Sequence, residues 1–142
     1  MKPWLLDAGP IIAYIDPRDP FPQAAVAAMD RFKGEFITTN AVIAEVMHFA
    51  KRRSHGPAVI LELLEAAGVH VEDYCQMSAI RRAVSIMEKY WDSGMDFADA
   101  TLVLLGEDRR LYSLCTLDVR GFSVFRTASG RRFELVLEPF AI

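Results

Sequence analysis

The stretch Met95-Asp-Phe-Ala-Asp-Ala-Thr-Leu-Val-Leu-Leu-Gly106 predicts a helix that opens with two acids and continues as an apolar run. Asp96 stands where an N-cap residue belongs, and Asp99 falls at the third helical position, so both carboxylates face the positive end of the helix. The residues that follow are apolar nearly all round, which is typical of a buried helix. Asp99 would then lie at the edge of a core, with no basic residue following it before Arg109. A carboxylate there needs a partner, and a cation shared with other acids would supply one.

Outward from this helix, the chain alternates strands with helices. We predict strands at residues 4–6, 36–38, 69–72 and 111–117, and further helices at 11–15, 22–33, 40–53, 57–67 and 78–91. Residues 122–127 and 132–137 predict a hairpin at the C-terminal edge of the sheet. This order is typical of a three-layer α/β sandwich with a mainly parallel central sheet. A length of 142 residues suits a single domain over residues 1–142.

Composition describes an ordinary globular domain, with 52% hydrophobic and 25% charged residues. A net charge of −3 argues against a generally basic nucleic-acid coat, although it leaves local patches open. Cys75 and Cys115 are far apart, which fits free buried thiols in a reducing cytosol. Trp4 and Trp91 are predicted core residues. Because no apolar run is long enough for a membrane span and no signal segment is present, we expect a cytoplasmic protein without membrane contact.

Four acids from distant segments are predicted to meet at one edge of the sheet. Asp7 follows the first strand and Asp118 follows the fourth. Glu45 lies in the helix after the second strand, and Asp99 opens the helix that precedes the fourth strand. The carboxyl ends of parallel strands share one edge, where a topological switch leaves a ligand-binding crevice. Clustered carboxylates repel one another, so this gathering makes physical sense chiefly around Mg²⁺ or Mn²⁺.

The four acids stand in motifs that resemble one family. The motifs are Leu5-Leu-Asp7-Ala, Thr38-Thr-Asn-Ala-Val-Ile-Ala-Glu45-Val-Met-His, Met95-Asp-Phe-Ala-Asp99-Ala, and Thr116-Leu-Asp118 with Phe122 behind it. In this order and spacing they resemble the PIN-domain ribonucleases, including the VapC-type toxins, over essentially the whole chain. The chain departs from that pattern at Gly121, where relatives often carry another acid.

The resemblance implies a metal-dependent endoribonuclease that hydrolyses RNA phosphodiester bonds. Its catalytic and metal-binding acids would be Asp7, Glu45, Asp99 and Asp118, with Asp96 as a further metal contributor, and its cofactor would be Mg²⁺ or Mn²⁺. The resemblance also implies a homodimer and, if the chain is the toxin of a type II toxin-antitoxin pair, a small antitoxin partner. The alternative is a catalytically weak or inactive PIN fold that serves as an RNA- or protein-binding module.

Several polar residues have two interpretations. Asp96 is either a helix cap alone or also a contributor to the metal site. Thr39 and Thr116 would bind substrate by positioning a phosphate or water, or they satisfy the local backbone at strand ends. The run Lys51-Arg52-Arg53 would bind the RNA backbone, or it complements the C-terminus of the helix before it.

Two other classes of α/β protein are disfavoured by single positions. A phosphatase of the haloacid dehalogenase type also places an Asp after its first strand, but it needs a second acid two residues later, where this chain has Gly9. A receiver-like signalling domain needs a lysine at a late strand end. The lysines of this chain do not meet that need, since they are Lys2, Lys33, Lys51 and Lys89.

Overall fold

A computed structural model of the chain describes residues 1–16 and 23–140. The elements in chain order are β1 (Trp4–Leu6), α1 (Ala8–Ile15), α2 (Gln23–Arg31), β2 (Phe36–Thr39), α3 (Asn40–Ala50), α4 (Gly56–Ala66), β3 (His70–Glu72), α5 (Met77–Lys89), the 3-10 helix η1 (Trp91–Ser93), α6 (Phe97–Arg109), β4 (Ser113–Cys115), α7 (Val119–Phe122), β5 (Glu134–Leu135) and the 3-10 helix η2 (Glu138–Phe140). The predicted helices and the first four strands are present, and α1 begins earlier than predicted because Asp7 caps it.

The sheet has five strands in the order β3-β2-β1-β4-β5, and every neighbouring pair is parallel. Leu5 is central, with Ile37 of β2 on one side and Leu114 of β4 on the other. Strands β2 and β3 follow β1 on one side of the sheet, whereas β4 and β5 lie on the other side of β1. The order therefore reverses between β1 and β4, and the carboxyl ends of these two strands flank the crevice where such sheets bind ligands.

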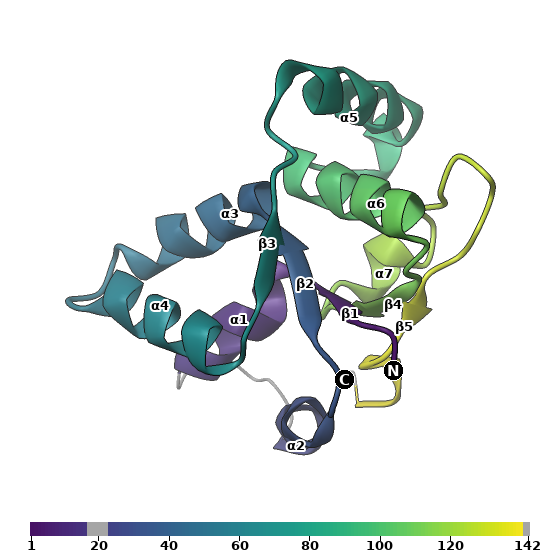
Figure 1. Ribbon diagram of the computed structural model, residues 1–142. Helices are drawn as coiled ribbons and strands as arrows, with labels where there is room; N and C mark the ends of the chain where they lie inside the picture. Colours follow the sequence, from purple (N-terminus) through teal and green to yellow (C-terminus); the bar gives the residue numbers. More distant parts are fainter. Residues whose placement is uncertain (17–22, 141–142) are drawn as a thin grey trace.

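Helices cover both faces of the sheet, as expected for a three-layer sandwich. In Figure 1, α5 and α6 lie on one side of the strands, and α1 and α4 lie on the other. Helix α3 packs against helices of both groups, namely α1, α4 and α6. The predicted burial of α6 is confirmed, because every residue from Ala100 to Gly106 is buried. Gly106 is needed there, since a Cβ atom would lie 2.8 Å from the Leu111 carbonyl oxygen.

The predicted C-terminal hairpin is wrong. The first predicted segment, residues 122–127, begins with the last residue of α7 and continues as a loop. Strand β5 runs parallel to β4 and does not pair with that segment. Phe122 packs edge to face against Phe125 and Phe133, with ring centroids 5.2 and 6.3 Å apart. The Thr127–Gly130 turn is real, with the Gly130 amide donating to the Thr127 carbonyl at 2.8 Å. The apolar spacing that suggested a strand therefore serves an aromatic cluster.

Two predictions about burial are also wrong. Trp91 has an exposed fraction of 75%, whereas Trp4 is half-buried and stacks on Phe32 at 3.8 Å between ring centroids. Both cysteines are free thiols, but only Cys115 is buried, and Cys75 is exposed. Among residues 1–16 and 23–140, no helix combines the length and the apolar character needed to cross a bilayer.

Candidate acidic site

Asp7 is the buried centre of the site, at the crevice between β1 and β4. Its side chain is 8% exposed, and its two oxygens accept separate hydrogen bonds. The Ala8 amide donates to Oδ1 at 2.8 Å, and the Thr116 hydroxyl donates to Oδ2 at 2.7 Å. Burial raises the pKa of Asp7 above its ordinary value, the two hydrogen bonds oppose that shift, and the charges of Asp96 and Asp118 add to it. The carboxylate is thus held in place in surroundings that disfavour its charge.

Thr116 links Asp7 to the segment after β4. Its buried hydroxyl donates to Asp7 and accepts a hydrogen bond from the Asp118 amide at 3.0 Å. Both functions of the hydroxyl are therefore used inside the protein. Thr116 positions an acid of the site, and it does so through its contact with Asp7.

Asp96 and Asp99 form the predicted start of α6. The Asp96 carboxylate accepts from the Asp99 amide at 2.8 Å, and the Asp99 carboxylate accepts from the Asp96 amide at 3.1 Å, which makes a reciprocal capping box. Burial, together with the charges of Asp96 and Asp7, raises the pKa of Asp99 to about 8. The carboxyl group therefore loses its proton only near neutral pH, chiefly because burial disfavours its charged form and also because negative charge lies nearby.

Glu45 approaches the same place from α3. Its side chain is partly desolvated, and this, with the charges of Asp96 and Asp7, raises its pKa. The structure therefore brings Glu45, Asp7, Asp96 and Asp99 close enough to affect one another's ionisation. Acids from distant segments therefore lie near one another at this edge, and their roles as metal ligands and catalytic residues stay predictions.

Asp118 lies at the rim and is exposed. Its carboxylate accepts from the Gly121 amide at 3.0 Å and so caps α7. A Cβ atom at Gly121 would lie 2.4 Å from Asp118 Oδ2. The glycine at the position where relatives often carry an acid thus permits this capped arrangement of Asp118.

The described residues supply these acids with no ion-pair partner. Within the described part of the chain, the ion pairs of Lys, Arg and His involve other carboxylates, and none reaches Asp7, Glu45, Asp96, Asp99 or Asp118. A gathering of carboxylate oxygens without a protein cation has the donor chemistry that Mg²⁺ and Mn²⁺ prefer. Four of these acids, Asp7, Asp96, Asp99 and Asp118, lie at helix starts, however, and Glu45 lies within α3. In residues 1–16 and 23–140 no group of three acidic, His or Cys side chains is arranged to hold one metal ion.

Thr39 is buried away from the crevice surface and has a structural task. Its hydroxyl accepts from the Val42 amide at 3.3 Å and bonds to the Thr101 hydroxyl at 2.8 Å, while Thr101 donates to the Ala98 carbonyl at 2.7 Å. This chain of bonds fixes the start of α3 against α6. Thr101 was not predicted, although a single hydroxyl in the apolar run 100–105 is the signal that would have indicated it.

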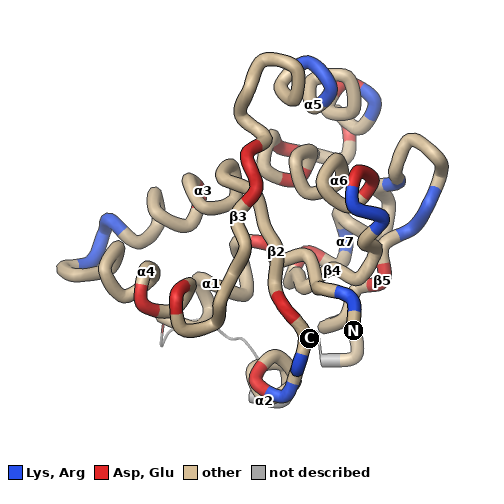
Figure 2. Tube along the Cα trace, in the orientation of Figure 1, with Lys and Arg blue, Asp and Glu red and all other residues tan. Residues whose placement is uncertain are grey.

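The basic run Lys51-Arg52-Arg53 lies in the turn between α3 and α4, at the outer end of the molecule in Figure 2. Arg53 donates to the Ile15 carbonyl at 2.8 Å and to the Asp16 carboxylate at 3.2 Å. It therefore complements a helix C-terminus, but that of α1 and not of the helix before it. Arg52 lies over the Phe49 ring, 5.8 Å from its centroid.

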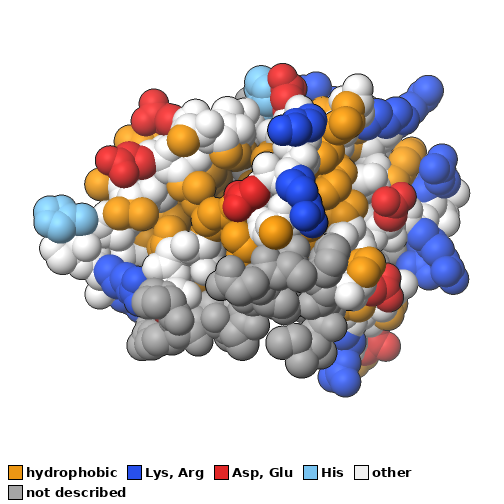
Figure 3. Space-filling view, turned by 90° about the horizontal axis from the view of Figure 1, so that it is seen from below, with side chains coloured by type: hydrophobic (Ala, Val, Ile, Leu, Met, Phe, Trp, Pro, Cys, Tyr) orange, Lys and Arg blue, Asp and Glu red, His pale blue; other side chains and the backbone are white. Residues whose placement is uncertain are grey.

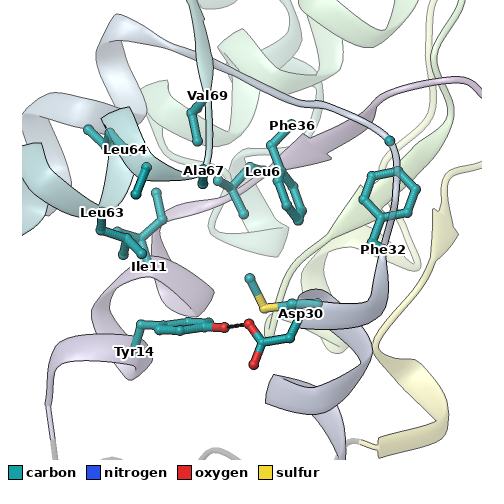
Figure 4. Close-up of a pocket in the computed structure, with 13 residues that line it drawn as sticks. Leu6, Ile11, Tyr14, Asp30, Phe32, Phe36, Leu63, Leu64, Ala67 and Val69 are labelled. Atoms are coloured by element: carbon teal, nitrogen blue, oxygen red, sulfur yellow. Dashed lines mark hydrogen bonds between the residues drawn. The ribbon is translucent and has the colours of Figure 1, made fainter.

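A second feature is an apolar cavity on the face shown in Figure 3, where hydrophobic side chains gather. It measures about 340 Å³ and lies between α1, α2 and α4. At one end the Tyr14 hydroxyl donates to the Asp30 carboxylate (Figure 4), and burial with this bond raises the pKa of Tyr14 to about 12. None of the five acids lines the cavity, whose apolar lining includes Leu6, Ile11, Phe36, Leu63, Leu64 and Val69.

A parallel five-stranded sheet with clustered acids at its switch point defines an α/β protein with a candidate cation-dependent site. The sequence model of the PIN domain matches residues 4–126, and the chain belongs to the PIN domain family. It is also similar to a protein named Ribonuclease VapC26 from Mycobacterium tuberculosis, with 30% identity over 133 residues that cover 93% of this chain and 98% of that protein.

Proposed function

We propose that the protein is a metal-dependent endoribonuclease of the VapC type. The observation that carries the proposal is the cluster of acids at the carboxyl ends of β1 and β4, whose pKa values are raised by burial and by one another's charge, and which form no ion pair with a basic residue among the described residues. A bound divalent cation would stabilise the charged form of such a cluster. The relative named as a ribonuclease supports RNA as the substrate.

We assign a role in the reaction to each residue of the site from its position. Asp7, Glu45, Asp99 and Asp118 would hold the divalent ion, with Asp96 beside them, while Thr116 keeps Asp7 in place. The ion, when bound, polarises the phosphate and lowers the pKa of the attacking water. Water adds to phosphorus and the bond to O3′ breaks, which leaves a 5′-phosphate and a 3′-hydroxyl. The ribose 2′-hydroxyl takes no part in this reaction.

The test is cleavage of single-stranded RNA by the purified protein with Mg²⁺, with Mn²⁺ or in excess chelator. We expect cleavage only with a metal ion, and 5′-phosphate ends on the products. Asp7→Asn should abolish turnover because it removes a charge from the site but keeps the shape of the side chain. Glu65→Gln, an exposed acid on α4 outside the site, is the matched control and should cleave normally. Undiminished cleavage in chelator, or full activity of Asp7→Asn, would contradict the proposal.

A non-catalytic PIN fold that binds RNA or protein is the second candidate. The observation that favours it is that Asp7, Asp96, Asp99 and Asp118 lie at helix starts, while no three acids of the described residues are arranged as the ligands of one ion. The same experiment separates the two functions. RNA that binds but stays intact with every divalent ion supports the binding module.

We further propose a homodimer and a small antitoxin partner, with the apolar cavity as the partner's docking place. A cavity of about 340 Å³ lined mainly by aliphatic and aromatic side chains suits the apolar face of an amphipathic helix. Leu63→Asp puts a charge in this lining and should abolish capture of a small protein encoded next to the gene, while Leu61→Asp on the exposed side of α4 should not. Equal capture by both variants would place the partner elsewhere, and light scattering of the purified protein tests the dimer.

A further inference from the structure

The most exposed large aromatic side chain in the described residues is Trp91, in the short helix η1. The residues that flank it are fixed, since Tyr90 is 9% exposed and Met95 is 6% exposed. The turn is also closed by hydrogen bonds from the Ser93 amide to the Tyr90 carbonyl and from the Gly94 amide to the Trp91 carbonyl, at 3.0 and 3.4 Å. The indole thus points outward from an anchored turn. Its exposure to water contributes nothing to the stability of the fold, because only burial of its apolar surface would do so.

This turn adjoins the acidic site along the chain. Trp91 precedes Asp96, the cap of α6, by five residues, so their Cα atoms lie within about 18 Å even if the segment were fully extended. The turn is also joined to the other side of the site. The Tyr90 hydroxyl accepts from the Arg126 amide at 3.2 Å, and the Tyr90 ring packs edge to face on Phe125 at 5.3 Å. Arg126 and Phe125 follow the helix that Asp118 caps.

Basic side chains accompany this aromatic turn. Lys89 lies over the Tyr90 ring, 5.4 Å from its centroid, and the Arg126 guanidinium donates to the backbone carbonyls of Ser123 and Phe125. Within the described part of the chain, neither Lys89 nor Arg126 forms an ion pair with an acid, and the same holds for Arg120 on α7. Their positive charge remains available to an anionic ligand.

The surroundings of Trp91 fit a nucleic acid better than a protein. Protein interfaces place exposed aromatic residues within a larger apolar patch. Here the exposed neighbours are charged, polar or small: Asp92, Ser93 and Gly94 follow Trp91, and Glu88 and Lys89 precede the turn, so two acids also flank the indole. A lone indole with nearby cations is instead the arrangement on which proteins stack the bases of single-stranded nucleic acid.

We propose that Trp91 is a substrate-binding residue that stacks on an unpaired base of the RNA strand beside the scissile phosphate, while Lys89 and Arg126 contact the flanking phosphates. The inference rests on the proposed ribonuclease function and gives that function a preference for unpaired RNA. Stacking of this kind does not select one base, because every base has an aromatic face. The protein should therefore bind unpaired RNA of many sequences and bind duplex RNA weakly.

The test measures binding without cleavage, in an Asp7→Asn background. Trp4 and Trp91 are the only two tryptophans, so Trp4→Phe leaves Trp91 as the sole indole reporter. Titration with a short unpaired RNA oligonucleotide should quench its fluorescence, and the same RNA in a duplex should not. Trp91→Ala should weaken binding about 5- to 100-fold, Trp91→Phe should retain most of the affinity, and Leu61→Ala on α4 should change nothing. If Trp4→Phe fails to fold, the difference in quenching between the Asp7→Asn protein and its Trp91→Phe variant gives the same signal.

The outcomes separate this inference from the function on which it rests. In the protein with Asp7 intact, Trp91→Ala should raise KM for unpaired RNA with little change in kcat. Metal-dependent cleavage with unchanged KM and unquenched Trp91 would overturn the inference and leave the proposed function standing. Absence of both RNA binding and cleavage would overturn both. A change in oligomeric state on Trp91→Ala, without loss of RNA affinity, would assign Trp91 to a contact between copies of the chain and overturn the inference.

Discussion

Replacement of Thr116 by valine tests the central contact of the site. Valine has nearly the shape of threonine, so the change removes the hydroxyl and leaves the packing. Two hydrogen bonds disappear, the one donated to Asp7 at 2.7 Å and the one accepted from the Asp118 amide at 3.0 Å. Because Thr116 is fully buried, water cannot replace the lost hydroxyl at that position.

The magnitude follows from the charge of the acceptor. A hydrogen bond to a charged group contributes about 1.5 to 3 kcal/mol, and one between neutral groups contributes about 1 kcal/mol. Thr116→Val should therefore lower the free energy of unfolding by roughly 3 kcal/mol where Asp7 is ionised, which corresponds to a Tm lower by roughly 5 to 10 °C. Loss of the hydroxyl also raises the already raised pKa of Asp7 further. The difference in the free energy of unfolding between wild type and Thr116→Val should then decrease toward about 1 kcal/mol as pH falls, because Asp7 becomes protonated in both proteins.

The assay is urea unfolding of metal-free protein from pH 4.5 to pH 8.5. Thr38→Val is the matched control, because Thr38 is equally buried and its hydroxyl donates to the neutral Leu6 carbonyl at 2.6 Å. It should cost about 1 kcal/mol at every pH. A Thr116→Val effect that is small, or that is as independent of pH as the control, would refute the assignment of Asp7 as a charged, hydrogen-bonded centre.

Further predictions concern the ion, the charge cluster and the basic turn. Mn²⁺ at ~100 times its dissociation constant should add about 2.7 kcal/mol to wild-type stability and little to Asp7→Asn, as measured by thermal melts, and equal shifts would remove Asp7 from the ligands. The raised pKa of Asp99 means that the folded apo protein binds more protons than the unfolded chain, so apo stability should fall as pH rises from about 4 through about 8, and a rise over that range would contradict it. Asp96→Asn should keep the helix cap, whereas Asp96→Ala should lower the free energy of unfolding by about 1 kcal/mol. Loss of RNA cleavage in the stable Asp96→Asn variant would identify Asp96 as a metal contributor. Retained cleavage would show that Asp96 serves only as a cap. Arg53→Ala should destabilise the fold without changing the salt dependence of RNA binding, because Arg53 holds the end of α1, whereas Lys51→Ala should reduce the salt slope by about one if this turn binds phosphate.

The sequence predicted those parts of the fold that depend on neighbours along the chain. The position of Asp96 as N-cap, the position of Asp99 at the third helical residue and the burial of α6 follow from residue types at fixed spacings, and all are confirmed. The parallel order of β1, β2 and β4 followed from the helices between them. From that order alone, Asp7 and Asp118 had to lie at the same edge.

Features that depend on distant packing were predicted poorly. Phe122 and Phe125 have the spacing of a strand, but in the folded protein their rings pack against Phe133 and Tyr90. These contacts exist only once distant parts of the chain have come together in the core. Arg53 was assigned to the nearest helix end, whereas the folded chain offers it the end of α1. The roles of the acids in metal binding and catalysis stay predictions.

Most acids of the site also cap the N-termini of helices, and this second role explains their arrangement. Asp7 caps α1, Asp118 caps α7, and Asp96 with Asp99 caps α6, so most of these carboxylates already accept backbone amide bonds. A cap needs only one carboxylate oxygen, which leaves lone pairs on the same group for a cation. The helix starts thus fix the positions of the acids, and none of the described basic residues forms an ion pair with them. The backbone that carries these acids is already positioned by the helices. Binding of an ion would therefore require movement of the side chains only. Affinity for the ion would then depend on the charges that it compensates and on the burial that disfavours those charges. Burial is the largest cause of the raised pKa of Asp7 and of Asp99, and both shifts lower the stability of the apo protein where these groups are ionised.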